Sequence, residues 1–143
     1  MQTVRALILV TLLWGQLLAS AVNIKVPLSD DLLAGSRMVL HIDGLKLPPH
    51  SSGMVRVFAG LPDADAKTSL ENEHYLGYVA VLPKNSIEAN QGIQRASVTL
   101  DLTNKRQFFA GKKQVTLTLI SLGEQKGESS MQRPTFTSVY ITH

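Results

Sequence analysis

The chain is a series of short β-type segments joined by connections too short to hold crossover helices. Segment 96–102 shows the pattern most clearly, because Val98, Leu100 and Leu102 alternate with polar residues as in a strand with one buried face. The expected strands lie at residues 23–28, 38–43, 54–58, 74–82, 96–102, 114–122 and 135–141. Parallel neighbours would need crossovers of a dozen or more residues, so we expect mainly antiparallel sheets. The sequence predicts an all-β fold, a β-sandwich or flattened barrel of six to seven strands.

Two segments depart from simple alternation. Residues 74–82 are apolar throughout, which predicts a central strand covered on both faces. Residues 103–110 predict one short helix, with Thr103 at its start and Gly111 at its end. The longest connections are expected to be polar loops at 60–72 and 123–134.

The N-terminus has the three parts of a cleavable signal peptide. Arg5 precedes an apolar run at 6–18, and Ala19-Ser-Ala21 supplies the small-x-small ending that signal peptidase needs. An uncleaved anchor is the alternative, but spanning a bilayer takes roughly 20 apolar residues, and this run is shorter and contains Gln16. We expect cleavage after Ala21 and export to the periplasm or the outside, with no membrane attachment afterwards.

The mature chain, residues 22–143, is expected to form a single β-sandwich domain. Its 122 residues are enough for a real core. The absence of cysteine excludes disulfides, a lipoprotein anchor, thiolate chemistry, cysteine zinc sites and blue-copper ligation. Without the signal peptide there are 13 basic and 11 acidic residues and no Lys/Arg-rich run, which argues against a nucleic acid partner.

No residue pattern predicts catalysis or a bound cofactor. None of the histidines lies within eight residues of another, so the usual spacing of metal ligands is missing. They are His41, His50, His74 and His143. The chain also lacks the nucleophile elbow, the P-loop and the dinucleotide fingerprint. We therefore predict no catalytic residues, no metal, no cofactor and no enzyme activity.

The residues are also compatible with two alternative hypotheses for the function. The first is an exported ligand-binding module for calcium or carbohydrate. Its carboxylates would come from one loop: Asp63, Asp65, Glu71 and Glu73. Its aromatic platform for a sugar ring would come from the tyrosines: Tyr75, Tyr78 and Tyr140. Against calcium, Lys67 interrupts the loop and the D-x-D-x-D-G spacing is absent.

The second alternative hypothesis is a hydrolase with a nonstandard site. Such an enzyme would need a concave pocket with convergent polar groups.

Basic residues flank an aromatic pair around the expected helix. Lys105-Arg106 and Lys112-Lys113 lie on either side of Phe108-Phe109. One interpretation is a contact patch for a partner protein. The other is a solvated helix whose phenylalanines close the end of the sandwich, since exposed apolar pairs are unusual without a partner.

One stretch resembles a known family. The sequence Arg56-Val-Phe-Ala-Gly-Leu-Pro-Asp-Ala-Asp-Ala66, followed by His74-Tyr-Leu-Gly-Tyr-Val-Ala-Val-Leu82, is similar to the C-terminal domain of bacterial tyrosinase and polyphenol-oxidase-like proteins. In that family the domain follows a helical di-copper catalytic domain. After Leu82, the expected strands and the short helix follow in the same order as in the family's domain. The resemblance therefore spans residues 37–141.

The resemblance implies a stand-alone accessory protein, because the family's helical bundle with its six copper-binding histidines is missing here. In the family this domain packs over the copper site and shields it. A separate copy would act in trans, as an inhibitory or chaperone-like partner of a tyrosinase-like copper oxidase. A loop side chain in such assemblies sits in the substrate pocket, and Tyr75 or Phe108 would be candidates. The candidate contact residues are Tyr75, Phe108, Phe109, Lys105 and Arg106.

Overall fold

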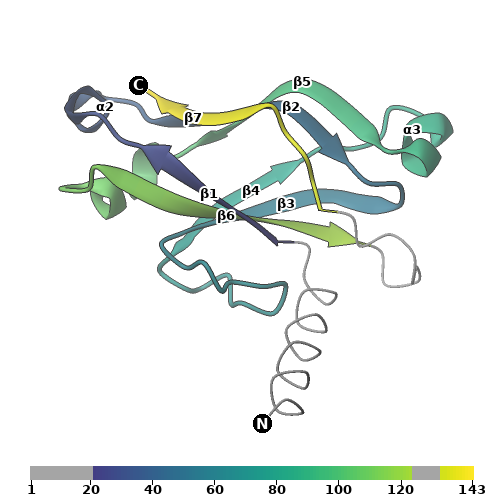
Figure 1. Cartoon of the computed structure of the whole chain (residues 1–143), viewed down its shortest axis with the longest axis horizontal. Helices are drawn as coiled ribbons and strands as arrows, with labels where there is room; N and C mark the ends of the chain where they lie inside the picture. Colours follow the sequence, from purple (N-terminus) through teal and green to yellow (C-terminus); the bar gives the residue numbers. More distant parts are fainter. Residues whose placement is uncertain (1–20, 124–132) are drawn as a thin grey trace, which may run out of the picture.

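The computed structural model describes residues 21–123 and 133–143 as two facing antiparallel sheets (Figure 1). One sheet has the strand order β1-β6-β3-β4 and the other the order β5-β2-β7. The strands are β1 (Ala21–Pro27), β2 (Val39–Leu47), β3 (Ser51–Ala59), β4 (Tyr75–Ala80), β5 (Ile93–Asp101), β6 (Gln114–Gly123) and β7 (Ser138–Thr142). The expected all-β sandwich of six to seven strands is confirmed. Except for Ala21, the predicted signal peptide lies outside the described residues, as does most of the loop expected at 123–134.

Among the described residues, three short helices accompany the strands. The expected helix is η1 (Thr103–Phe109), a 3-10 helix. Sequence pattern did not predict α2 (Asp30–Ala34) or α3 (Ser86–Gln91), which lie at opposite ends of the sandwich in Figure 1. Within the described part of the chain, no helix is long and apolar enough to cross a membrane.

The core lies between the two sheets and follows the alternation of the strands. Leu40 and Ile42 of β2 face Leu117 and Leu119 of β6, and all four are almost completely buried. Because the chain has no disulfide, this apolar burial is the main stabilising contribution to the fold.

Strand β6 is buried on both faces. It pairs with β1 on one side and β3 on the other, and its outward-facing Thr118 and Ile120 have no exposed surface. They are covered by residues 60–74, the connection between β3 and β4, which we call the covering loop. Ile120 packs there with Phe58 and Ala64 in a second apolar cluster. The connection expected to be a solvated polar loop therefore forms part of the hydrophobic interior.

Hydrogen bonds fix the covering loop to the sheet beneath it. The Thr118 hydroxyl lies 2.7 Å from Asn23 Oδ1 and 3.1 Å from the Leu61 carbonyl oxygen, either of which accepts its proton. The Asn23 side-chain amide donates to the Pro62 carbonyl at 3.0 Å. These contacts satisfy the polar groups that burial of the outer face would otherwise leave unpaired.

The prediction that residues 74–82 form a central strand covered on both faces is wrong. Strand β4 is an edge strand, with Leu76 and Val79 buried but Tyr78 about half exposed. The outward-facing side chains of Tyr78 and Ala80 are exposed to solvent. An uninterrupted apolar run therefore does not indicate burial on both faces here. A register shift of β3 against β4, between Val57 and Phe58, further interrupts the alternation.

Four strand boundaries also differ by three or more residues from those expected. Strand β2 continues past Asp43 to Leu47, and β5 begins at Ile93 instead of residue 96, because these two extensions pair with each other. Strand β3 begins at Ser51, three residues before the expected start, because pairing with β6 continues into the Ser-Ser-Gly turn. Strand β7 begins only at Ser138, and Thr135 instead makes an isolated bridge with Lys46.

The role of the covering loop can be tested by cutting back the side chain beneath it. Ile120→Ala should lower the free energy of unfolding by about 2–5 kcal/mol, because it leaves a cavity in a fully buried site. The control Leu70→Ala, at an exposed position of the same loop, should change it by less than about 0.5 kcal/mol. Urea unfolding of both variants measures the difference. Equal small effects would mean that the loop does not cover Ile120.

Candidate functional site

The structure brings Phe108 of η1 against the covering loop. Its ring meets the His74 ring edge-on, with the centroids 5.3 Å apart. The Lys112 ammonium lies 3.7 Å from the centroid of the Phe108 ring, within the range of a cation–π interaction. Phe108 is half-buried. The aromatic and basic residues therefore share a surface with His74, which the sequence pattern did not group with them.

The other residues of the predicted contact patch have different environments. Phe109 has no exposed surface and closes the end of the core, so a contact through it would require it to leave the interior. Lys105 is exposed, whereas Arg106 is half-buried and donates a hydrogen bond to the Gly35 carbonyl. Arg106 thus ties η1 to the residue that follows α2.

Tyr75 lies on the outer face of the four-stranded sheet. Its ring packs at 5.2 Å from the ring of Phe58, in the apolar cluster under the covering loop. Burial raises the pKa of the Tyr75 hydroxyl, an effect that the nearby Arg56 cation partly opposes. Tyr75 is therefore a neutral, half-buried side chain adjacent in the chain to His74.

Within 21–123 and 133–143, no group of three or more His, Asp or Glu side chains is placed to hold a metal ion. His41 stacks on Tyr140 with 4.8 Å between ring centroids, and its Nε2 lies 2.7 Å from the Thr142 hydroxyl. In the covering loop, the Asp65 carboxylate accepts the Lys67 backbone N–H at 2.8 Å and so stabilises a turn. These contacts give a local structural role to Tyr140 and Asp65, two of the residues considered for sugar or calcium binding.

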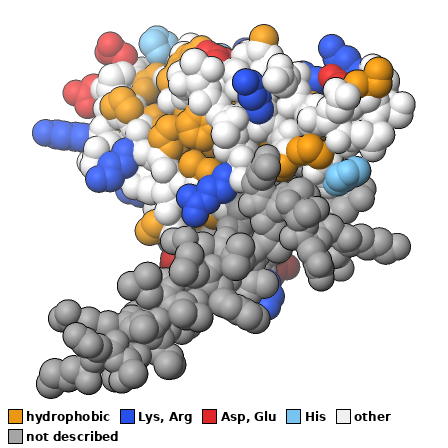
Figure 2. All heavy atoms as spheres, turned by 45° about the vertical axis from the view of Figure 1, so that its right-hand side comes forward, with side chains coloured by type: hydrophobic (Ala, Val, Ile, Leu, Met, Phe, Trp, Pro, Cys, Tyr) orange, Lys and Arg blue, Asp and Glu red, His pale blue; other side chains and the backbone are white. Residues whose placement is uncertain are grey.

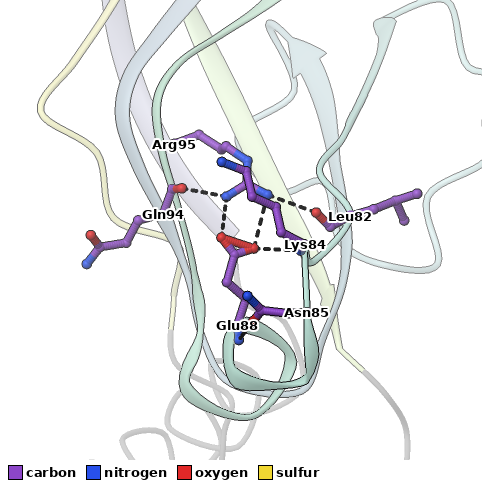
Figure 3. Close-up of polar contacts among 6 residues, drawn as sticks. All are labelled: Leu82, Lys84, Asn85, Glu88, Gln94 and Arg95. Carbon is purple, nitrogen blue, oxygen red and sulfur yellow. Dashed lines mark hydrogen bonds and ion pairs between the residues drawn. The ribbon is translucent and has the colours of Figure 1, made fainter.

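A second surface, which the sequence analysis missed, centres on Arg95 of β5 (Figure 3). Its guanidinium donates to both carboxylate oxygens of Glu88, at 2.8 and 3.2 Å, and to the carbonyls of Leu82 and Gln94, at 2.9 and 2.7 Å. Glu88 also accepts the backbone N–H of Lys84 at 2.7 Å. We call residues 82–91 the anchored loop, because this network fixes them to the N-terminal part of β5.

The network strongly favours the charged form of Glu88. The hydrogen bonds from Arg95, followed by that from the Lys84 backbone, lower the pKa of the Glu88 carboxyl to about 2. Charge-assisted bidentate pairs of this kind hold geometry well even when they add little net stability.

The anchored loop exposes two large apolar side chains. Leu82 is 73% exposed and Ile87 is 63% exposed, the highest values among the large hydrophobic residues that the structure describes. The sequence does contain a signal for the helix, since Asn85 followed three residues later by Glu88 is a typical helix start. The Asn85 side chain indeed accepts the Glu88 backbone N–H at 2.9 Å.

Comparison with known proteins identifies the fold. Recombinant latent aurone synthase, a polyphenol oxidase, has a TM-score of 0.53 and 17% identity, over 85% of this chain and 23% of that one. The same enzyme from its natural source gives 0.53 and 16%, over 85% and 24%. Latent apple tyrosinase gives 0.54 and 13%, over 85% and 25%. No protein-family model and no curated protein matches the chain.

These likenesses confirm the resemblance at the level of the fold. The chain has the architecture of one part of the latent polyphenol oxidases and spans only about a quarter of their length, as a C-terminal domain of a tyrosinase-like protein alone would. At identities of 13–17%, the match concerns the arrangement of the strands and not the activity of the whole oxidases.

The Arg95–Glu88 network makes a prediction about pH. With its pKa lowered from 4.5 to about 2, Glu88 should stabilise the folded state fully above pH 4.5 and lose this contribution as the pH falls through about 2. NMR titration of the Glu88 carboxyl should give a midpoint near 2, and Arg95→Ala should move it up toward 4.5. The control Arg37→Ala, which alters a different ion pair, should leave it in place. A wild-type midpoint near 4.5 would contradict the observed geometry.

Proposed function

We propose that this chain is an exported, non-catalytic accessory protein that binds a separate tyrosinase-like copper oxidase and shields its active site. The observation that carries the proposal is the fold match, which covers 85% of this chain but only about a quarter of oxidases described as latent. In this proposal, a domain with that fold covers a copper site that a separate protein provides.

The architecture supports a covering role. The core is closed at one end by Phe109, and both faces of β6 are buried, so the sandwich is a rigid support for its loops. Loops on rigid scaffolds commonly carry binding functions, since they vary without disturbing the core. Shielding requires only shape and contact, and no reacting group of the chain itself.

The candidate contact surface is formed by Phe108, His74 and Lys112, with Tyr75 beside it. Phe108 is half-buried, and the His74 ring and the Lys112 ammonium hold its ring from two sides. An ordered, half-buried aromatic ring loses little conformational freedom on binding, which makes it a suitable anchor. In this proposal Lys105 lies at the edge of the contact.

Shielding can be measured on the isolated partners. Adding the purified chain to the tyrosinase-like oxidase of the same organism should inhibit diphenol oxidation in a saturable way, and dilution should restore the activity. Phe108→Ala should weaken the inhibition about tenfold or more, as expected for an interface anchor. Thr99→Ser, an exposed position on the other sheet, serves as the matched control.

A deletion strain provides the independent test. Without this chain, the oxidase should show altered copper loading or premature activity, and the two proteins should co-purify from the wild type. Oxidase activity and copper loading in the deletion strain that equal those of the wild type, with no co-purification, would overturn the proposal.

Export also has a direct test. Cleavage after Ala21 would leave Val22 as the first residue, still able to pair with Leu119 in the observed register of β1 and β6. Mass spectrometry of the protein from the exported fraction should therefore find a chain that starts at Val22. An intact chain starting at Met1 in the membrane fraction would contradict signal cleavage.

A further inference from the structure

We infer that the anchored loop is a docking surface for an acidic protein surface with an apolar centre, distinct from the contact made by Phe108. The inference rests on the proposed function only for the identity of the partner, the tyrosinase-like oxidase. The presence of the docking surface is argued from the chain's own residues. Figure 2 turns the α3 end toward the viewer and shows hydrophobic side chains at the surface, with basic and acidic side chains near them.

The apolar centre consists of Leu82 and Ile87. Single exposed apolar residues are common on protein surfaces and need no explanation. Here, however, the two most exposed large hydrophobic side chains among the described residues lie five positions apart on one short segment. Such a pair is the kind of feature that a partner protein buries at the centre of an interface.

The segment is held rigidly in its exposed position. Arg95 binds the backbone carbonyl of Leu82 itself, and Glu88 lies one residue after Ile87 in α3. Glu88 in turn binds the backbone of Lys84, between the two apolar residues. Three hydrogen bonds from one guanidinium, two to Glu88 and one to Leu82, thus fix a surface segment that buries no side chain in α3. This pre-organisation reduces the entropy lost when the segment binds.

Charge indicates the chemistry of the occupant. Glu88 is neutralised by Arg95, so the carboxylate closest to the apolar pair attracts no further cation. Lys84, on the anchored loop, makes no ion pair with any described residue. The same holds for Lys46, which lines a groove of about 480 Å³ beside α3 together with Pro48 and Gln91. A partner surface with carboxylates around an apolar centre complements this arrangement, whereas a second copy would bring lysines together.

The experiment uses the fact that the chain has no cysteine, so a single introduced thiol is a unique attachment point. Ile87→Cys and the control Thr99→Cys, an exposed position of β5 outside both proposed contact surfaces, are labelled with a benzophenone maleimide. Each is then irradiated with the exported proteins of the source organism. The position-87 probe should crosslink to an acidic protein that the position-99 probe does not reach, and mass spectrometry identifies that protein.

Affinity measurements on the purified crosslinked protein complete the test. The double variant Leu82→Ser with Ile87→Ser should weaken binding at least tenfold, while its circular dichroism and urea midpoint stay close to the wild type. Lys84→Glu should slow association and reduce its dependence on salt, whereas Lys67→Glu, in the covering loop, should do neither.

Each outcome decides the question. No crosslink at position 87, equal crosslinking at both positions, or unchanged affinity of the folded double variant would overturn the inference. Crosslinking of the chain to itself would make a second copy the occupant and would also overturn it. If the captured acidic protein loses affinity for the double variant but is not a copper oxidase, the docking surface stands and its assignment to the oxidase fails. The proposed function is decided separately, by the inhibition assay with Phe108→Ala.

Discussion

The double burial of β6 is the constraint on which the rest of the structure depends. On the outer face of β6, Thr118 and Ile120 have no exposed surface, and the opposite sheet covers only the inner face of the strand. The covering loop supplies the other cover and is fixed by the Thr118 hydroxyl and the Asn23 amide. In a chain without disulfides, this loop adds a second apolar cluster to the core and places His74 against Phe108.

The two ends of the sandwich use similar physical means for different surfaces. At one end, Phe109 fills the core and leaves Phe108 between Lys112 and His74. At the other end, Arg95 fixes a loop whose apolar side chains point away from the core. At each end, a fixed side chain, Phe109 or Arg95, thus determines which side chains next to it stay accessible. This arrangement suits the proposed function, binding to another protein, because the core stabilises the fold while the loops carry the candidate contact residues.

Part of the candidate site was predictable and part was not. The basic and aromatic cluster around η1 was visible in the sequence, and the alternative interpretation, closure of the core by phenylalanine, is correct for Phe109. The pattern did not show that His74 joins Phe108, since the two are brought together only by the path of the covering loop. Leu82 was expected to be buried, as the last residue of the apolar run 74–82, but it is exposed. Ile87 was missed because a polar stretch gives no periodicity from which to infer the direction of an apolar side chain.

The sequence by itself determined the fold class, because side chains alternate across a strand and short connections force antiparallel pairing. It also determined which faces of β2 and β6 point inward. Only the tertiary structure decided that β6 lies in the centre of its sheet and β4 at the edge. The physical reason is that burial of an outer face depends on what packs over it. For β6 this is a loop from elsewhere in the chain, which no local pattern in the strand records.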